Sequence, residues 1–377
     1  MNIEEVRREF PICQEKIYLD SALYNSGSLK AQQALQQYFA EGFSGVLRDK
    51  SQWNAKVAEV KQRLSVMLEG IDPSGIAITK NTVEGINLIA QGFPWQVGDQ
   101  VIITDQEHTS NTLPWLALKN RGVEVCVLEA VDHFLPIELF EKAIQPRTRI
   151  ISVSHIQSPT GYKTDLKELG RLCQKHGVFL VTDAIQSIGV SPILPISWGI
   201  DGIAAGAHKW MLGIPGVGFL WLSPALLSLV APSFAGASGV CRVNKQYWTT
   251  EYIHPNDARK FELSNLNFPG LYAMSSGLEL IEELGLPSIY QHLEQLNTRL
   301  QHGLLECGYH LATPTDTHYR GATTSIAVEQ PDHLRRYLAE HNIQVSKVDS
   351  RFVRFSVGVF NQNEDIDTTL AVLKNYR

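Results

Sequence analysis

Lys209 stands in a setting where lysines are seldom found. It follows the small residues Gly206 and Ala207 and precedes the apolar run 210–212. Lysine side chains usually lie on the solvated surface. In an apolar setting the charged form of the amine is disfavoured, so the amine becomes a better nucleophile toward an aldehyde. Lys209 is therefore a candidate for covalent chemistry.

Asp183 is the second candidate, because it ends the apolar run Phe179–Thr182. An acid at the end of a strand can bind a metal, a ribose or a protonated ring nitrogen. The same residue can also simply cap a following helix. Both interpretations of Asp183 stay open from the local sequence.

Two further polar clusters follow apolar runs. Asn81, Thr82 and Val83 come after Ile76–Thr79 and begin a predicted helix. Free N–H groups and a hydroxyl at a helix N-terminus can hold a phosphate, although Asn or Thr there often acts only as a cap. His108 follows the next run, where a lone histidine is more often solvent-facing than functional.

A regular alternation between residues 76 and 223 positions these candidates. Helix-length amphipathic stretches separate several of the short apolar runs, and the clearest places Leu166, Leu169 and Leu172 on one face. Strands that alternate with helices predict a mostly parallel sheet. Ligands bind at the carboxyl ends of such strands, so we expect the candidates to meet in one site. The predicted strands are Ile76–Thr79, Val101–Thr104, Val123–Leu128, Ile150–Ser154, Phe179–Thr182 and Gly202–Ala205.

The character of the chain changes after about Pro255. Two helical patterns and then strand-like runs mixed with helices predict a smaller α+β domain. We therefore expect a large domain over 15–255 and a small domain over 256–377. Whether residues 1–14 pack on the small domain stays open.

Composition excludes several classes of protein. The chain has 377 residues, 44% hydrophobic content and a formal net charge of −6 without basic runs, which argues against nucleic-acid binding. The uncharged stretch 210–241 is interrupted by prolines and glycines, which argues against a membrane span. Five scattered cysteines predict neither a metal site nor disulfides, and they fit a reducing cytoplasm. The charged N-terminus does not resemble a signal peptide.

Taken together, these clusters resemble the fold-type-I enzymes that use pyridoxal 5'-phosphate (PLP), in the aminotransferase class V and cysteine desulfurase-like branch. The resemblance runs in order from Leu19-Asp20 to the C-terminus. It implies a PLP-transferase fold and a homodimer with sites at the interface. The motifs that carry it are Asn-Thr-Val-Glu-Gly-Ile-Asn (81–87), Glu-His (107–108), Ser-His-Ile-Gln-Ser-Pro-Thr-Gly (154–161), Thr-Asp-Ala-Ile-Gln-Ser (182–187), Ala-His-Lys-Trp (207–210), Phe-Glu-Leu-Ser-Asn-Leu-Asn-Phe-Pro-Gly (261–270) and Arg-Phe-Ser-Val-Gly (354–358).

The resemblance assigns roles to most of the candidates. Lys209 would hold PLP as an imine and later move the Cα proton of an amino-acid substrate. Asp183 would pair with the pyridine nitrogen and keep PLP a strong electron sink. His108 would stack on the ring, and Gln186 would bond the phenolic oxygen. Arg354 would clamp the substrate carboxylate.

The remaining roles concern the cofactor phosphate and the surroundings of the ring. Asn81, Thr82, Val83 and His208 would hold the phosphate, and Asn265 would reach the phosphate of the neighbouring subunit. Ser158 stands near the phenolic oxygen, where desulfurases usually have Asn.

Other departures from the family concern hydroxyl groups near the phosphate. Gly206 stands where Ser is frequent, and Val83 and Asn265 stand where Thr is common. Each loses or replaces one hydroxyl, so phosphate contacts are expected to be fewer or redistributed.

An absence is the most informative departure. Desulfurases carry a persulfide on a cysteine in the loop before the terminal arginine, and here the loop 344–353 has none. A persulfide-forming desulfurase is therefore disfavoured.

Several functions stay open. We expect a PLP-dependent transformation of an amino acid, most simply transamination. The alternatives are a cysteine or cystine C–S lyase, an epimerase, and a protein that binds PLP without turnover. Arg354 argues against the last, because a non-catalytic binder has no need of a carboxylate clamp. Candidates for the substrate face of PLP are Tyr24, Asn25, Trp248 and Tyr252, although such residues taken singly are more often structural than catalytic. A nucleotide-dependent dehydrogenase is weaker still, since no G-x-G-x-x-G opens the first helix.

Overall fold

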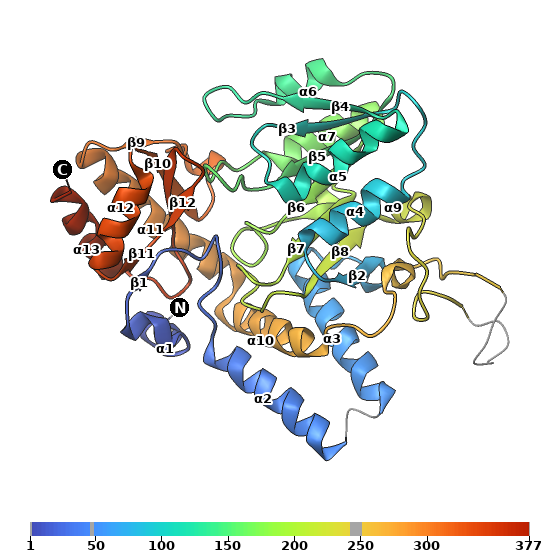
Figure 1. Ribbon diagram of the computed structural model, residues 1–377, viewed down its shortest axis with the longest axis horizontal. Helices are drawn as coiled ribbons and strands as arrows, with labels where there is room; N and C mark the ends of the chain where they lie inside the picture. The colour runs from blue at the N-terminus through green and yellow to red at the C-terminus, as the bar shows by residue number, and fades with distance from the viewer. Residues whose placement is uncertain (1, 46–48, 242–250, 377) are drawn as a thin grey trace.

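The computed structural model describes residues 2–45, 49–241 and 251–376. Two sheets organise this part of the chain, and they lie side by side in Figure 1 with the small one at the left. The large sheet contains β2 (Ile76–Thr79), β3 (Gln100–Thr104), β4 (Glu124–Leu128), β5 (Thr148–Ser154), β6 (Phe179–Asp183), β7 (Gly202–Gly206) and β8 (Gly218–Leu222). The small sheet contains β9 (His310–Leu311), β10 (Thr323–Ala327), β12 (Ser346–Val348) and β13 (Phe352–Ser356).

The helices and the remaining strands complete the two domains. Those that precede or cover the large sheet are α1 (Ile3–Arg8), α2 (Leu29–Ser44), α3 (Lys50–Met67), α4 (Thr82–Gly92), α5 (Leu113–Leu116), α6 (Ile137–Ala143), α7 (Leu166–His176), α8 (Pro195–Trp198) and α9 (Pro224–Leu229). Those that follow it are α10 (Phe268–Leu284), α11 (Leu286–Glu306), α12 (Pro331–Glu340) and α13 (Asn363–Lys374). A short parallel pair joins β1 (Ile17–Tyr18) to β11 (Ile343–Gln344).

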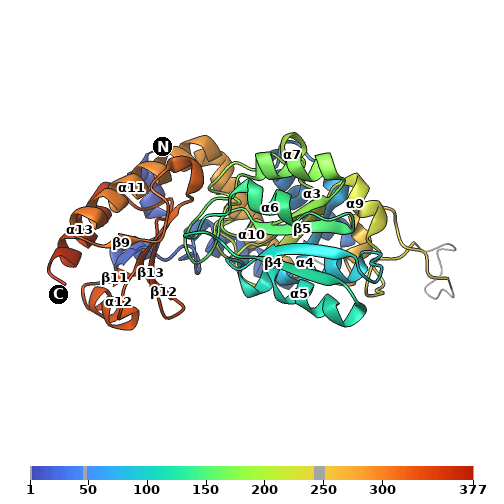
Figure 2. The ribbon, with the colours of Figure 1, turned by 90° about the horizontal axis from the view of Figure 1, so that it is seen from above.

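The large sheet has the order β2-β8-β7-β6-β5-β3-β4. Only β8 runs against its neighbours, so the predicted mostly parallel sheet is confirmed. Helices cover both faces, and Figure 2 shows α7 and α5 on opposite sides of the sheet. Strands that are buried on both faces have nearly continuous apolar sequences, which explains the apolar runs found in this part of the chain. The carboxyl ends of β3, β5, β6 and β7 thus meet at one edge.

Helix α7 shows why the local sequence folds as it does. Asp165 accepts a hydrogen bond from the Glu168 N–H at the start of the helix, and Gly177 ends it with a φ of 66°. Its buried face consists of Leu166, Leu169, Gly170, Leu172 and Cys173. The predicted helix is therefore confirmed.

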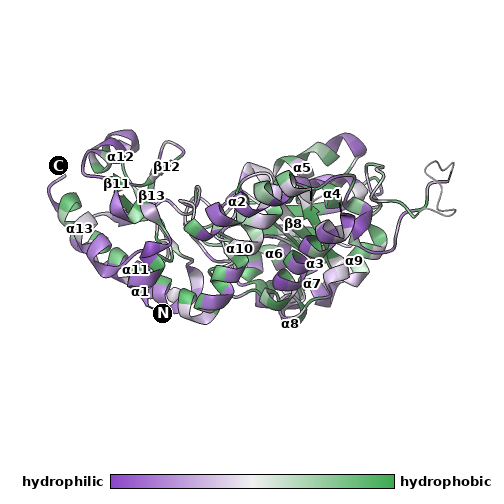
Figure 3. Cartoon of the chain, turned by 90° about the horizontal axis from the view of Figure 1, so that it is seen from below, coloured by the Kyte–Doolittle hydropathy of each residue, from purple (hydrophilic) through white to green (hydrophobic). Residues whose placement is uncertain are grey.

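The core divides within α10. Met274 and Leu278 pack with the core of the large domain, whereas Leu280 and Ile281 pack with that of the small domain. The N-terminal residues Val6 and Phe10 also belong to the small-domain core. The boundary near residue 255 stays a prediction, and this packing favours a division about one helix later. In Figure 3, apolar and polar residues alternate along the helices around the apolar strands.

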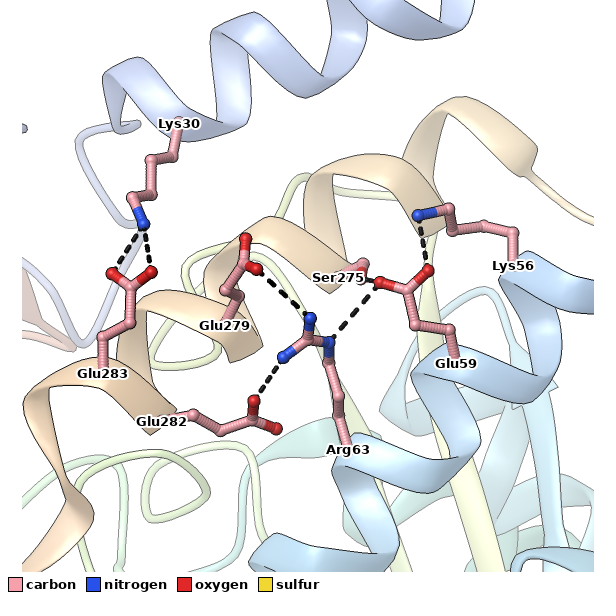
Figure 4. A network of polar contacts seen from close by, with 8 residues as sticks. All are labelled: Lys30, Lys56, Glu59, Arg63, Ser275, Glu279, Glu282 and Glu283. Atoms are coloured by element: carbon pink, nitrogen blue, oxygen red, sulfur yellow. Dashed lines mark hydrogen bonds and ion pairs between the residues drawn. The ribbon is translucent and has the colours of Figure 1, made fainter.

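An ion-pair cluster fastens α10 to α3 (Figure 4). The Arg63 guanidinium of α3 lies between Glu59 of its own helix and Glu279 and Glu282 of α10. Lys30 of α2 pairs with Glu283 at 2.5 Å. Together with the apolar contacts between these helices, the cluster gives α10 a fixed position.

Among the described residues, no helix combines the length and the apolar character needed to cross a bilayer.

Candidate active site

The loop after β7 presents Lys209. The Ala207 N–H donates to the Val217 carbonyl and the Gly213 N–H donates to the Ala207 carbonyl, each at 2.9 Å, which folds the loop back on itself. Asn25 donates from Nδ2 to the Gly213 carbonyl at 2.7 Å and from its backbone to His208. Burial, reinforced by the nearby Arg354 cation, lowers the pKa of the Lys209 amine to about 8. A pKa of about 8 leaves a substantial fraction of the amine neutral near physiological pH, and the neutral form attacks an aldehyde.

Helix α10 supports this loop from behind. Gly277 lies so close to the loop that an added Cβ would collide with the Met211 carbonyl oxygen. Met211 and Met274 belong to the same buried cluster. The position of Lys209 thus depends on a glycine in a helix that begins nearly sixty residues later in the chain.

Asp183 ends β6 and is 2% exposed. Its Oδ1 accepts a hydrogen bond from the Ile185 N–H at 2.9 Å, while Oδ2 accepts none from the described residues. A turn rather than a helix follows, so helix capping does not account for this acid. Burial raises the pKa of the carboxyl group to about 7, and the neighbouring Glu107 adds to the rise. A free buried carboxylate oxygen fits a protonated ring nitrogen, which would offset this cost.

His108 follows β3 and is exposed. Its Nδ1 accepts the Ser110 N–H at 3.1 Å, which fixes the ring at the start of a short 3-10 turn. Partial burial of the ring, together with the cations of Lys209 and Arg354, lowers the pKa of the imidazole. Its stacking on the cofactor ring stays a prediction.

Glu107, the neighbour of His108, was quoted in a motif but given no role from the sequence. Its carboxylate accepts the Ser154 N–H at 2.9 Å, Gln157 Nε2 at 2.7 Å and Asn111 Nδ2 at 2.8 Å. These donors come from two segments, the 3-10 turn after β3 and the end of β5, so Glu107 ties the end of β3 to the end of β5. The Glu-His pair itself was the signal that could have indicated this role.

The N-terminus of α4 meets the end of β7. Thr82 Oγ1 accepts the Gly206 N–H at 3.0 Å, and its own hydroxyl hydrogen stays available. The Asn81 side chain accepts the Glu84 N–H and acts as the helix cap. The first-turn N–H groups, including that of Val83, have no partner within the helix. This corner fits a phosphate, and the individual phosphate contacts stay predictions.

His208 explains one departure from the family. A Cβ at position 206 would lie 3.1 Å from His208 Nδ1, so Gly206 gives the imidazole room. Burial and the Lys209 cation lower the pKa of His208 to about 4, which keeps the ring neutral and able to donate one hydrogen bond. Tyr24 lies beside it, with ring centroids 5.9 Å apart.

Gln186 is held in one orientation. Its Oε1 accepts Trp210 Nε1–H at 2.9 Å, and its Nε2 donates to the Ala22 carbonyl at 3.0 Å and lies 3.4 Å from Ser158 Oγ. One amide hydrogen therefore points to the Ala22 carbonyl and the other toward Ser158. Bonding of the cofactor oxygen by either residue stays a prediction.

Arg354 is 4% exposed in β13, and its five N–H donors can be accounted for. Nη1 donates to the Ser158 carbonyl at 2.9 Å and to Ser158 Oγ at 3.0 Å, and Nη2 donates to Ser346 Oγ at 3.2 Å. Among the described residues, one N–H on Nη2 and the N–H of the buried Nε have no partner. Two adjacent free donors match the two oxygens of a carboxylate.

Some predicted residues lie elsewhere. Asn265 is exposed and lines a cavity of about 460 Å³ with Trp53 and Lys61. No hydrogen bond or ion pair joins it to the other candidates within the described residues. Tyr252 is 53% exposed beside His254, and Trp248 lies outside the described residues.

Comparison with known proteins supports the resemblance. The sequence model of the family described as Aminotransferase class-V matches residues 17–369. A probable cysteine desulfurase of Methanothermobacter thermautotrophicus is 32% identical over 78% of this chain and 73% of its own length. One from Pyrococcus abyssi is 27% identical over 98% of this chain and 96% of its own.

Solved structures agree with the fold. The apo cysteine desulfurase of Thermococcus onnurineus superposes with a TM-score of 0.90 at 25% identity, covering 98% of this chain and 97% of its own. A cystine C–S lyase in complex with cysteine persulfide has a TM-score of 0.89 at 24% identity, covering 97% and 99%. The PLP-transferase fold is confirmed. The chain belongs to the aminotransferase class-V family, and its cofactor is PLP.

Proposed function

We propose that this protein cleaves the C–S bond of cysteine or cystine with PLP and passes no sulfur to a thiol of its own. The relatives reported above are named cysteine desulfurases, which favours sulfur chemistry over the transamination first expected. The observation that carries the proposal is the hairpin beside Arg354. It contains no cysteine.

The hairpin between β12 and β13 is short and closed. Val348 pairs with Phe352, so only residues 349–351 form the turn. Arg351 donates from Nε and Nη2 to Asp349 Oδ2 and lies over the Phe352 ring, 4.8 Å from its centroid. A turn this tight leaves no room for a mobile thiol-bearing loop.

The cysteines of the chain lie in other segments. Burial raises the pKa of Cys13 to about 11 and that of Cys173 to about 12, so both stay protonated and weakly nucleophilic. The other three follow none of the site strands, at Cys126, Cys241 and Cys307. Sulfur would therefore leave with the product.

The residues of the site support β-elimination. When bound, PLP accepts the electrons released as the Cα–H bond breaks. Arg354 would hold the substrate carboxylate, and the Lys209 amine would take the Cα proton. The Cβ–S bond then breaks and the sulfur leaves with the electron pair, as sulfide from cysteine or as cysteine persulfide from cystine. The three-carbon fragment is released as an enamine, which water converts to pyruvate and ammonia. No external oxidant or reductant is required.

The test begins with the visible spectrum of the purified protein. We expect a yellow protein, and a Lys209→Ala variant that does not retain PLP after borohydride treatment, whereas the reduced parent protein keeps it covalently. Cysteine and cystine are then supplied while pyruvate, sulfide and pyridoxamine phosphate are assayed.

Each product pattern has one meaning. Pyruvate with sulfide or persulfide, without pyridoxamine phosphate, is the expected result. Accumulation of pyridoxamine phosphate with a keto acid would restore transamination, and change of configuration without either product would indicate an epimerase. Retention of PLP with no turnover of any amino acid would indicate a non-catalytic binding protein.

A further inference from the structure

Arg354 carries a buried charge without a carboxylate in contact. Within the described residues, no Asp or Glu oxygen lies within 4.0 Å of its nitrogens. Buried cations are usually paired, because an unpaired charge in a protein interior costs several kcal/mol. The acid whose charge acts on it is Asp20, which opposes the effect of burial on the pKa of the guanidinium.

Ser346 lies between the two charges. Its hydroxyl is hydrogen-bonded to Asp20 Oδ1, and its Oγ accepts Arg354 Nη2 at 3.2 Å. A serine hydroxyl has one hydrogen to donate. Because the Asp20 carboxylate can only accept, that hydrogen goes to Asp20, and the Ser346 oxygen faces Arg354 as an acceptor. The acid thus determines the direction of both hydrogen bonds.

Asp20 is itself held firmly. It is 2% exposed, and Gln344 Nε2 donates to its Oδ2 at 3.3 Å. The backbone of the preceding Leu19 donates to the Gln344 carbonyl at 2.9 Å and accepts the Ser356 N–H at 2.8 Å. The carboxylate is therefore fixed between the ends of β11 and β13.

The two ends of the guanidinium are now accounted for. Ser158, from the large domain, occupies Nη1, and Ser346, from the small domain, takes one hydrogen of Nη2. The free pair on Nε and Nη2 keeps its direction only while both ends are held.

We propose that Asp20 is a positioning residue that orients Arg354 through Ser346, and so determines affinity for substrates with an α-carboxylate. The inference rests on the proposed function, because it takes Arg354 to be the carboxylate clamp. In this proposal Asp20 acts through Ser346 and Arg354 and not by direct contact with the substrate.

Two effects of the Asp20 charge oppose each other. Its negative charge repels an incoming carboxylate, whereas its hydrogen bond to Ser346 fixes the guanidinium that receives the carboxylate. The Arg354 cation would lie between Asp20 and the substrate carboxylate, and its positive charge would offset their repulsion. A bidentate contact also loses most of its strength when the fork rotates. We therefore expect the loss of orientation to outweigh the relief of repulsion, so that removal of the Asp20 charge weakens carboxylate binding.

The test compares glycine with methylamine, which differ only in the carboxylate and have no Cβ substituent to eliminate. Their dissociation constants are measured from the absorbance change of the PLP-loaded protein. In the Asp20→Asn and Ser346→Ala variants we expect the dissociation constant of glycine to rise about tenfold. A change of this size corresponds to the loss of one oriented charge-assisted hydrogen bond. The dissociation constant of methylamine should not change. The double variant should bind glycine no more weakly than Ser346→Ala alone, because both substitutions interrupt the same series of hydrogen bonds from Asp20 through Ser346 to Arg354.

Two reference variants separate the explanations. Asp365→Asn removes another buried acid of the small domain, which pairs with Arg7 at 2.8 Å, and it should leave both constants unchanged. Arg354→Lys tests the clamp itself. If it leaves glycine binding intact, the role of Arg354 in the proposed function is wrong.

If Arg354→Lys weakens glycine binding while Ser346→Ala and Asp20→Asn leave it unchanged, only the positioning role is overturned. The same holds if Ser346→Ala or Asp20→Asn strengthens glycine binding. Equal loss for methylamine would also overturn it, because that would indicate general disruption of the site. Should Asp20→Asn not fold, Ser346→Ala alone decides.

Discussion

The amine of Lys209 is under opposing influences. Burial and the Arg354 cation favour its neutral form, whereas the negative charges of Asp183 and Asp20 favour the protonated form. The balance places the pKa at about 8, well below that of an exposed lysine. Only the neutral amine attacks an aldehyde, so this balance controls how readily the protein takes up its cofactor.

Capture of PLP by the apoprotein should therefore depend on pH. Below a pH of about 8 we expect the rate to rise about tenfold per pH unit, and above it to level off, since the fraction of neutral amine follows that course. Stopped-flow absorbance after mixing with PLP measures it. Arg354→Met should move the midpoint upward, because it removes a cation that lowers the pKa of Lys209. Arg299→Met, which removes a surface cation paired with Asp367, should not. A rate independent of pH would contradict this account.

The sequence predicted the residues that follow strands better than those that act through other segments. Lys209, Asp183 and His108 each come directly after an apolar run, which is a local pattern. Asp20 and Ser346 are 326 positions apart, and nothing in the local sequence of either indicates the hydrogen bond between them. Side-chain pairs of this kind depend on the tertiary fold.

Helices and strands were predictable where their periodicity is clear. The caps of α7 agree with its amphipathic pattern. Helix α10, one of the two helical patterns expected after Pro255, begins at Phe268 because Asn267 caps it. The orientation of β8 against its neighbours could not be predicted, since an apolar run reads alike in both directions. No helix was predicted over α2, where Phe39 and Phe43 are 56% and 92% exposed and weaken the amphipathic pattern.

Helix α10 offers a test of how the Lys209 loop is supported. In an exposed helix, Gly→Ala stabilises by up to about 1 kcal/mol. In Gly277→Ala we expect the opposite, a loss of about 1–3 kcal/mol, because the new methyl group must displace the Met211 and Leu212 carbonyls. PLP affinity should fall with it. Thermal unfolding with and without PLP measures both, with Ser276→Ala as the neighbouring control, whose hydroxyl bonds only within its own helix. Increased stability of Gly277→Ala would show that the loop is not packed against the helix as described.

The N-terminal segment connects the small domain to the Lys209 loop of the large domain. Residues 17–25 pair with the small domain at β11, pass Asp20 beside β13, and reach the Lys209 loop at Asn25. Figure 1 shows this segment passing between the two domains. Among the residues predicted to bind the cofactor, Asn265 stays outside this site, because it lies on the surface of its own chain. The homodimer that the family resemblance implies would give Asn265 a phosphate to bind in the neighbouring subunit.

Complementation between two inactive variants tests this arrangement. Lys209→Ala lacks the essential amine, and Asn265→Ala would lack the contact to its neighbour. In a mixed dimer, one site combines Lys209 from one chain with Asn265 from the other and is intact. After unfolding and refolding an equal mixture, about a quarter of all sites should regain full affinity for PLP, since half of the dimers are mixed and each has one intact site. Light scattering would give twice the 42.1 kDa chain mass. If no site of full affinity appears although mixed dimers form, Asn265 serves its own chain or no site at all, and its exposure then has no role in cofactor binding.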